Sequence, residues 1–204
     1  MLNKQGFNAW AKSYEKKVYA SYKKDIYPFS GYYDVLYEIY QTVIDLNPKK
    51  VLDIGVGTGL LASVLYNENI KIYGMDFSDA MLKHAKMRMY NATLRPFDMN
   101  EGLHPDLKDV MYDVIVSTYT MHHLPIQKQL DFIRDLKHNL TDKGIIIIGD
   151  IMFKDEKHKN TTKNHPDIAW DNEEFYLVYE TVKDRLPKHT FKVVSDSAGI
   201  LIFT

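Results

Sequence analysis

The sequence contains no cysteine among its 204 residues. Without a thiol there can be no disulfide framework, no thiolate-bound zinc, no iron–sulfur cluster and no cysteine nucleophile. An excess of charge is also lacking, because 26 lysines and arginines oppose 27 acidic residues and leave a formal net charge of -1. This balance argues against dominant, sequence-independent binding of nucleic acid, which requires a basic surface.

Long apolar runs are missing too. The most apolar stretch, residues 144–153, is interrupted by Asp150 and is far shorter than the roughly 20 residues that a membrane helix needs. The start of the chain holds no apolar stretch of signal-peptide length. We therefore expect a cytoplasmic protein with no membrane partner.

What the chain does contain fits one globular domain. Hydrophobic residues make up 45% and charged residues 26%, which is ordinary for a soluble protein with a sizeable core. Residues 1–47 have the three-and-four spacing of helices, and from residue 49 short β-branched runs alternate with helical ones. This alternation predicts βαβ units and a mostly parallel sheet. We expect strands at 51–54, 70–75, 92–94, 112–117 and 145–149, helices at 58–67, 79–89, 125–140 and 173–186, a turn at 142–144, a polar loop over 154–169, and a final strand pair at 190–195 and 200–203.

A glycine-rich loop follows the first predicted strand. Residues 51–61 read VLDIGVGTGLL, with glycines at 55, 57 and 59. Glycine permits positive φ and lets a ligand approach the backbone, and the following helix offers free N–H groups. The dinucleotide fingerprint places its third glycine one residue later, where this chain has Leu60. Asp76 follows the second strand, where a carboxylate can accept both hydroxyls of a ribose, so the whole arrangement predicts nucleoside binding.

These residues resemble motif I of the class I S-adenosylmethionine (SAM)-dependent methyltransferases, and Asp76 matches the ribose-binding acid of that family. Residues 97–99 are similar to its adenine-recognition segment, and residues 7–14 to the N-terminal box of small-molecule members. A narrower resemblance, to small and poorly characterised bacterial members, is carried by the VSTYxxHHL segment at 116–124 and by residues 149–153. The family likeness implies SAM as cofactor, bound by Tyr14, Asp53, Gly55, Gly57, Thr58, Gly59, Asp76, Phe77, Asp98, Met99 and Ser117.

The resemblance also implies the fold. It is an α/β, Rossmann-like, doubly wound sheet of seven strands in the order 3-2-1-4-5-7-6, with the last strand antiparallel. The whole chain, 1–204, is then a single methyltransferase domain, with a helical lid over 1–47 and an α/β core over 48–204. Eight of the 15 tyrosines fall in the first 40 residues. We expect Tyr33, Tyr37 and Tyr40 to be core residues, and the others to form an aromatic lid over the glycine loop that excludes water.

Methyl transfer from a sulfonium depends mainly on positioning, because the leaving group is already good. A general base is needed only where the acceptor must lose a proton. After the fourth strand, His122 and Tyr119 are the catalytic candidates; Tyr119 is more suited to shaping the pocket. Asp150 is a second candidate base, and the alternative for each is a structural role, with a buried, hydrogen-bonded histidine and an aspartate that caps a loop.

Several chemistries are excluded or left open. The absence of cysteine excludes cytosine-C5 transfer, radical SAM clusters and thiol-dependent arsenic methylation. No His/Asp/Glu group has metal-ligand spacing, so we expect no metal. About fifty residues follow Phe153, which leaves little room for an appended substrate domain, so we expect selectivity to come mainly from the N-terminal helices and the loops after the fourth and fifth strands. The acceptor that we favour is a small molecule. The sequence sets neither the acceptor atom nor the oligomeric state.

Three alternatives stay open. An RNA (tRNA) methyltransferase is suggested by two groups of lysines, although nucleic acid is the less favoured partner. A SAM-binding protein without transfer activity is the second alternative, since no indispensable catalytic residue is visible. A dinucleotide-dependent oxidoreductase is the weakest. The lysines are Lys4, Lys12, Lys16, Lys17, Lys23 and Lys24 near the N-terminus, and Lys154, Lys157, Lys159 and Lys163 after the fifth strand.

Overall fold

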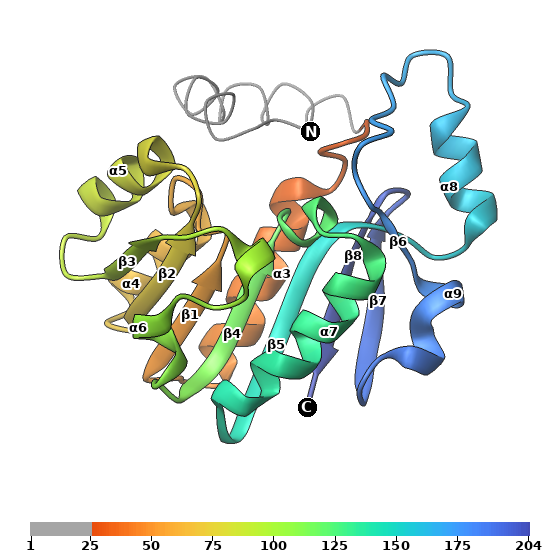
Figure 1. The fold of residues 1–204 in the computed structure, drawn as a ribbon. Coiled ribbons are helices and arrows are strands. Elements are labelled where there is room, and N and C mark those ends of the chain that lie inside the picture. The colour runs from red at the N-terminus through yellow and green to blue at the C-terminus, as the bar shows by residue number, and fades with distance from the viewer. Residues whose placement is uncertain (1–25) are drawn as a thin grey trace.

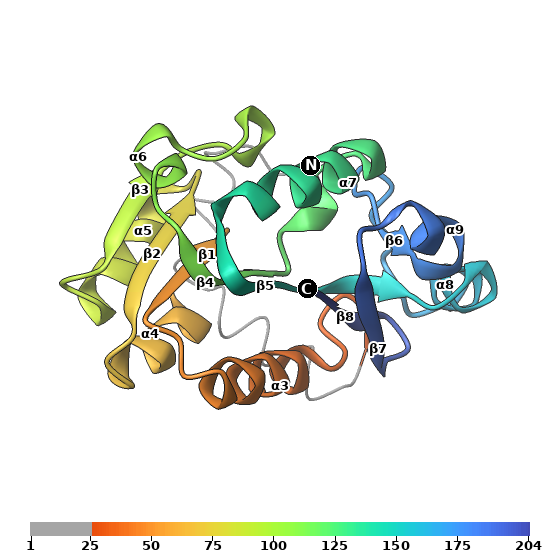
Figure 2. The ribbon, with the colours of Figure 1, turned by 90° about the horizontal axis from the view of Figure 1, so that it is seen from below.

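The computed structural model describes residues 26–204, and its centre is a β-sheet between two layers of helices (Figure 1, Figure 2). The strands are β1 (Lys50–Ile54), β2 (Lys71–Asp76), β3 (Thr93–Pro96), β4 (Tyr112–Thr118), β5 (Leu140–Phe153), β6 (Leu177–Val178), β7 (His189–Ser195) and β8 (Ala198–Phe203). The helices are α3 (Tyr32–Asp45), α4 (Leu60–Asn67), α5 (Asp79–Arg88), α6 (Pro105–Lys108), α7 (Ile126–Leu136), α8 (Glu156–Lys163) and α9 (Tyr179–Val182). Short 3₁₀ turns are η1 (Met99–Glu101), η2 (Met121–His123), η3 (Lys137–Asn139) and η4 (Lys183–Arg185).

The strands run in the order β3-β2-β1-β4-β5-β8-β7, with the two-residue β6 paired to β5 outside this path. The first five strands are parallel, and β8 is antiparallel to both β5 and β7. Leaving β6 aside, this is the predicted seven-strand order with its last strand antiparallel. The predicted α/β doubly wound fold is therefore confirmed.

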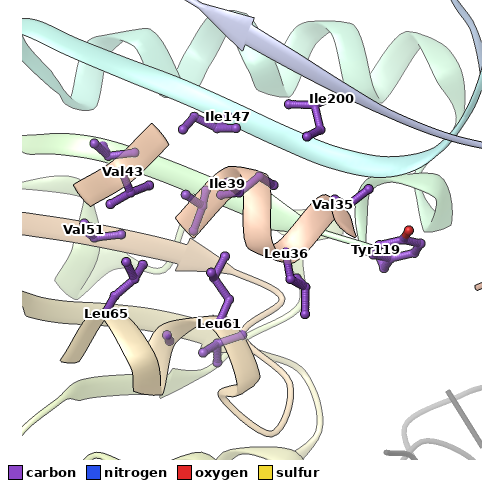
Figure 3. Close-up of a cluster of buried hydrophobic side chains, with 14 of the residues drawn as sticks. Val35, Leu36, Ile39, Val43, Val51, Leu61, Leu65, Tyr119, Ile147 and Ile200 are labelled. Carbon is purple, nitrogen blue, oxygen red and sulfur yellow. The ribbon is translucent and has the colours of Figure 1, made fainter. Parts of the chain in front are cut away.

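Helix α3 packs on one face of the sheet beside α4 and α5. Its aliphatic side chains Val35, Ile39 and Val43 are fully buried, and Figure 3 shows them directed toward β1, β5 and β8. Burying such a side chain contributes about 1.5–3 kcal/mol. Because α3 shares this core with the strands, it belongs to the helix layer of the α/β unit.

The buried face of α3 also differs from the predicted one. Tyr37 is 64% exposed, and Tyr33 and Tyr40 are only partly buried, whereas the neighbouring positions Tyr32 and Leu36 face inward. The physical reason is that the aliphatic side chains Val35, Ile39 and Val43, which carry no polar group, take the fully buried positions. The tyrosines can leave their hydroxyls in water, and Tyr40 donates to Glu68 at 3.1 Å.

The opposite face of the sheet is covered by α6, α7 and α9. Leu130, Ile133 and Leu136 are buried on the side of α7 that faces the sheet. The helix begins one residue after Pro125, and the chain from 137 to 139 tightens into η3 before β5 begins at Leu140. With helices packed on both faces, the carboxyl ends of the parallel strands lie along one edge of the sheet.

Three local predictions were wrong. Residues 142–144 are not a separate turn but lie within β5. Residues 141–144 there face a single residue of β4, Asp113, between two positions at which β4 and β5 are paired. The predicted loop over 154–169 contains α8, which buries no residue and so has no apolar periodicity to reveal it. The predicted helix over 173–186 is replaced by β6, α9 and η4, because Leu177 and Val178 pair with the end of β5.

A search of the helices within residues 26–204 finds none that is long and apolar enough to cross a membrane.

Candidate active site

A cavity of about 790 Å³ lies at the carboxyl ends of the parallel strands. Its walls come from the loops after β1, β2, β3 and β4, the start of α3 with the segment before it, and residues 169–174. The site is therefore built where parallel α/β sheets bind their ligands. Tyr27, Phe29 and Tyr32 line it together with the glycine loop, so the described part of the predicted aromatic lid does border the cavity.

The three glycines after β1 have different roles. All have positive φ, at 72°, 53° and 79° for Gly55, Gly57 and Gly59. A side chain at Gly55 would collide with Thr120, and one at Gly59 would meet Met89 Cε at 2.8 Å. A side chain at Gly57 would meet only the Gly55 carbonyl oxygen, at 3.9 Å. Gly55 and Gly59 thus permit close packing, and Gly57 is the one with open space at its backbone.

Asp53 is the buried acid at the end of β1. Its side chain is 2% exposed and lines the cavity, and its Oδ1 has no hydrogen-bond partner among residues 26–204. Burial, and then the charge of Asp76, raises the pKa of Asp53 to about 7. A buried carboxylate oxygen without a partner is costly unless a ligand completes it, and a positively charged donor suits it best.

Asp76 lies at the end of β2 beside the same loop. Its Oδ2 accepts the Gly57 N–H at 2.9 Å and its Oδ1 accepts the Ser78 N–H at 2.8 Å. Burial raises the pKa of Asp76 to about 6, although these two hydrogen bonds oppose the shift. The carboxylate is thus held in place, with its remaining lone pairs available to hydroxyl donors.

The structure brings most of the predicted cofactor residues to this cavity. Those that line it are Asp53, Gly55, Gly57, Thr58, Asp76, Phe77, Asp98 and Met99. Gly59 does not line it but forms the N-cap of α4. Ser117 does not line it either, since its buried Oγ donates to the Ile54 carbonyl at 3.1 Å and joins β4 to β1. Tyr14 lies outside the described residues.

Tyr119 has the left-handed backbone conformation, with φ 49°. This is rare for an aromatic residue and costs on the order of 1 kcal/mol or more, so the surroundings must hold it. Its N–H donates to the Gly149 carbonyl at 2.8 Å, and its ring lies 4.6 Å from that of Tyr32. The residue shapes the cavity wall between the glycine loop and His122.

His122 is a buried histidine fixed by Asp150 at the end of β5. Asp150 accepts the His122 N–H at 3.1 Å and contacts its Nδ1 at 2.5 Å. Burial alone would lower the pKa of His122, but the charges of Asp150 and Glu174 outweigh it and raise this pKa. Asp150 also accepts the Ile151 N–H, which gives it the capping role that sequence reasoning named as the alternative to a base.

Sequence reasoning missed Glu174, which lies against both histidines. Its Oε2 is 3.7 Å from His122 Nε2, and its Oε1 is 3.7 Å from His123 Nδ1. Burial, and then the charge of His122, lowers the pKa of His123 far below its ordinary value. No sequence signal pointed to Glu174, because it stands fifty residues from the histidines in a segment that was predicted to be helical.

The loop after α8 is held against this cluster by aromatic rings. Trp170 stacks on Tyr27 at 5.1 Å and meets Tyr176 edge-on at 4.9 Å. The hydroxyls of Tyr27 and Tyr176 are hydrogen-bonded to each other. Tyr27 and Tyr176, 149 positions apart in the sequence, are thereby packed together beside the cavity.

Two of the four lysines after β5 are engaged by neighbouring side chains. Lys159 pairs with Glu156 at 3.8 Å, and Lys163 donates to Asn172 and lies over the Trp170 ring. The N-terminal lysines lie outside the described residues. Binding of RNA stays an untested alternative with no support from α8.

Comparisons with known proteins agree with this geometry. A family model described as a methyltransferase domain matches residues 46–190. An uncharacterized methyltransferase of Oceanobacillus iheyensis is 31% identical over 197 residues, covering 92% of this chain and 88% of its own. The uncharacterized methyltransferase YrrT of Halobacillus halophilus is 29% identical over 194 residues, again 92% and 88% of the two chains.

Solved structures share the fold. A SAM-dependent methyltransferase from Clostridium acetobutylicum has a TM-score of 0.69 at 13% identity, covering 93% of this chain and 97% of its own. Magnesium protoporphyrin IX methyltransferase from Synechocystis, solved with bound SAH, has a TM-score of 0.66 at 16% identity, covering 98% of each chain. The family match and the fold lead to one conclusion: the chain belongs to the methyltransferase domain family and has the class I methyltransferase fold.

Proposed function

We propose that this methyltransferase transfers a methyl group from SAM to a small-molecule acceptor, and that residues 116–124 place it with the small bacterial members that share this segment. The donor is SAM, which supplies the methyl group on a sulfonium when bound. The observation that carries the proposal is the pairing of two carboxylates, Asp53 and Asp76, around the open backbone of Gly57.

We assign the donor end of the cavity to these residues. Asp76 would accept the two ribose hydroxyls, and the partnerless Oδ1 of Asp53 suits the positively charged amino group of the donor. Asp98 lines the cavity and accepts the backbone N–H of Asn100 at 2.8 Å, which holds it where the adenine amine is expected. Phe77 and Met99 supply the apolar walls.

The acceptor end lies beyond Tyr119 and has aromatic walls. Tyr27, Tyr32 and Tyr119 exclude water there, and His122, Asp171 and Glu174 supply its polar groups. Because positioning and desolvation are the main needs of methyl transfer, the rigid packing of these residues is the chief catalytic contribution. Aromatic rings and the carboxylates of Asp171 and Glu174 wall this end, which favours a small acceptor over a polyanionic nucleic acid.

Transfer of label tests the acceptor class. With methyl-labelled SAM and a size-fractionated bacterial extract, we expect label to enter the low-mass fraction and to depend on the protein. Label that enters the RNA or protein fraction instead would contradict the small-molecule proposal. Label that stays in SAM with every fraction would favour a binding protein without transfer.

The raised pKa values of Asp53 and Asp76 predict that SAM affinity depends on pH. Both carboxylates bind cationic or hydroxyl donors best when ionised, so affinity should fall as pH drops through about 7 and then about 6, by about tenfold per pH unit for each carboxylate. The stability of the protein without SAM should instead decrease as pH rises. A carboxyl whose folded pKa is raised stabilises the fold below its ordinary pKa of about 4 and loses this contribution as pH rises through about 6 to 7.

Calorimetric titration with SAM between pH 5 and 8 measures the dependence. Asp53→Asn should remove the step near pH 7, and Asp142→Asn, an exposed residue at the far end of β5, should leave the profile unchanged. A flat wild-type profile would contradict ionisation of these carboxylates on binding.

A further inference from the structure

We infer that His122, His123 and Glu174 form a site for a divalent transition-metal ion of the zinc class at the acceptor end of the cavity. This inference deepens the proposed function, because it gives the acceptor a point of attachment. It differs from the expectation of no metal, which rested on the absence of a local ligand motif.

The geometry brings three ligand atoms together. One nitrogen from each histidine and a carboxylate oxygen of Glu174 all lie within 4.8 Å of one another. The two separations between Glu174 and the histidine nitrogens, each 3.7 Å, are too long for hydrogen bonds. Atoms that bind one ion at about 2.0–2.2 Å stand about 3.0–3.5 Å apart, so the widest pair, within 4.8 Å here, would close by up to roughly 1.3–1.8 Å.

Each of two ligands is oriented by a partner behind it. Asp150 holds Nδ1 of His122, which leaves Nε2 directed toward Glu174. Tyr176 donates its hydroxyl to Glu174 Oε2 at 2.6 Å. A carboxylate behind a histidine and a donor behind a carboxylate are the usual supports of metal ligands, since they fix the tautomer and the direction of the lone pair.

The loop that carries Glu174 is also fixed in register with the histidines. The Phe175 N–H donates to the His122 carbonyl at 2.8 Å. The buried side-chain amide of Gln129 donates to the carbonyls of both Leu124 and Phe175, each at 2.8 Å. Segments fifty residues apart are thereby joined on both sides of the cluster, so the ligand set is pre-arranged.

The donor set indicates the class of ion. Two imidazoles and one carboxylate suit zinc, iron(II) or nickel better than magnesium or calcium, which prefer oxygen ligands alone. Two histidines and a glutamate also form open zinc sites that keep a position for a further ligand. The three ligands line the cavity, so an acceptor bearing an ionisable hydroxyl or thiol could bind the ion there through its oxygen or sulfur. His122 would then be a ligand and not a base.

Metal content of the chelator-treated and reloaded protein tests the inference. We expect one Zn²⁺ per chain after dialysis, and about tenfold to hundredfold weaker binding in His123→Ala and in Glu174→Gln. Tyr176→Phe should keep the ion with about tenfold lower affinity, because it removes only the support of Glu174. His158→Ala, which alters an exposed histidine paired with Asp155, is the control and should bind as the wild type does.

Spectroscopy and folding controls sharpen the result. Cobalt(II) at the site should give visible absorption bands that Glu174→Gln changes and His158→Ala does not. Circular dichroism and thermal melting identify any variant that is unfolded. If His123→Ala is unfolded, Tyr176→Phe tests the site in its place. A wild-type protein that retains no zinc, as expected if His122 simply carries a proton between Asp150 and Glu174, overturns the inference.

The same samples separate this inference from the proposed function. SAM binding, measured by calorimetry with and without metal, should survive in Glu174→Gln. A wild-type protein that holds no zinc but binds SAM refutes the metal site alone, and absence of SAM binding in the wild type refutes the proposed function whatever the metal content.

Discussion

Replacing Asp76 with alanine is expected to weaken SAM binding by at least about a hundredfold. Two hydrogen bonds from ribose hydroxyls to a charged acceptor contribute about 1.5–3 kcal/mol each, and their joint loss corresponds to about a hundredfold to ten-thousandfold. The change also releases the Gly57 N–H, which Asp76 Oδ2 accepts at 2.9 Å, and so loosens the loop that touches the donor. Titration calorimetry measures the affinity.

Two further variants make this result specific. Asp98→Ala should cost about tenfold, because Asp98 is exposed and would supply a single hydrogen bond. Asp142→Asn, remote from the cavity, should have no effect. If Asp76→Ala folds normally and binds SAM as the wild type does, the assignment of the donor end to this carboxylate is wrong.

Replacing Gly55 with alanine should lower the free energy of unfolding by about 3 kcal/mol or more. Its φ of 72° is strained for any residue with a side chain, at about 1–2 kcal/mol. The new Cβ would also stand 2.7 Å from Thr120 Cβ and closer still to its Oγ1 and Cγ2, and such overpacking costs about 1–3 kcal/mol. Urea unfolding measures the loss.

Gly57→Ala is the matched control for this effect. It shares the positive φ, at 53°, but a new Cβ there has no neighbour nearer than 3.9 Å. It should cost only about 1 kcal/mol of stability and should instead weaken SAM binding, because it fills the open space beside the backbone. Equal losses of stability in the two variants would contradict the separation of packing from ligand contact in this loop.

That the residues of the proposed donor end share one cavity could be predicted from the sequence, because they stand at the ends of strands. Strand order and hydrophobic pattern place Gly57, Asp76 and Asp98 on the same edge, whatever the details of packing. The exception, Ser117, is also at a strand end, but its hydroxyl meets the Ile54 carbonyl of the neighbouring strand. Sequence alone cannot decide whether a polar side chain near the end of a buried strand contacts a ligand or hydrogen-bonds to the neighbouring strand.

The acceptor end could not be predicted, since it depends on contacts between distant segments. Glu174 reaches the histidines because β6 pairs with β5 and because the Gln129 side chain donates to the carbonyl of Phe175, the residue after Glu174. Helical periodicity in residues 173–186 suggested a different structure, and the tertiary pairing overrode it. Helix α8 was missed for a different reason. It is polar and capped by Asp155, and it has no apolar face that would produce a helical pattern in the sequence.

The aromatic stack of Tyr27, Trp170 and Tyr176 has an evolutionary consequence. It joins the segment before α3 to residues 170–176, and both Trp170 and Tyr176 contact Phe153 of β5. Substitutions in these segments can therefore alter which acceptor fits while the donor end stays intact. Relatives that share this sheet can be expected to diversify in substrate range through these two segments first.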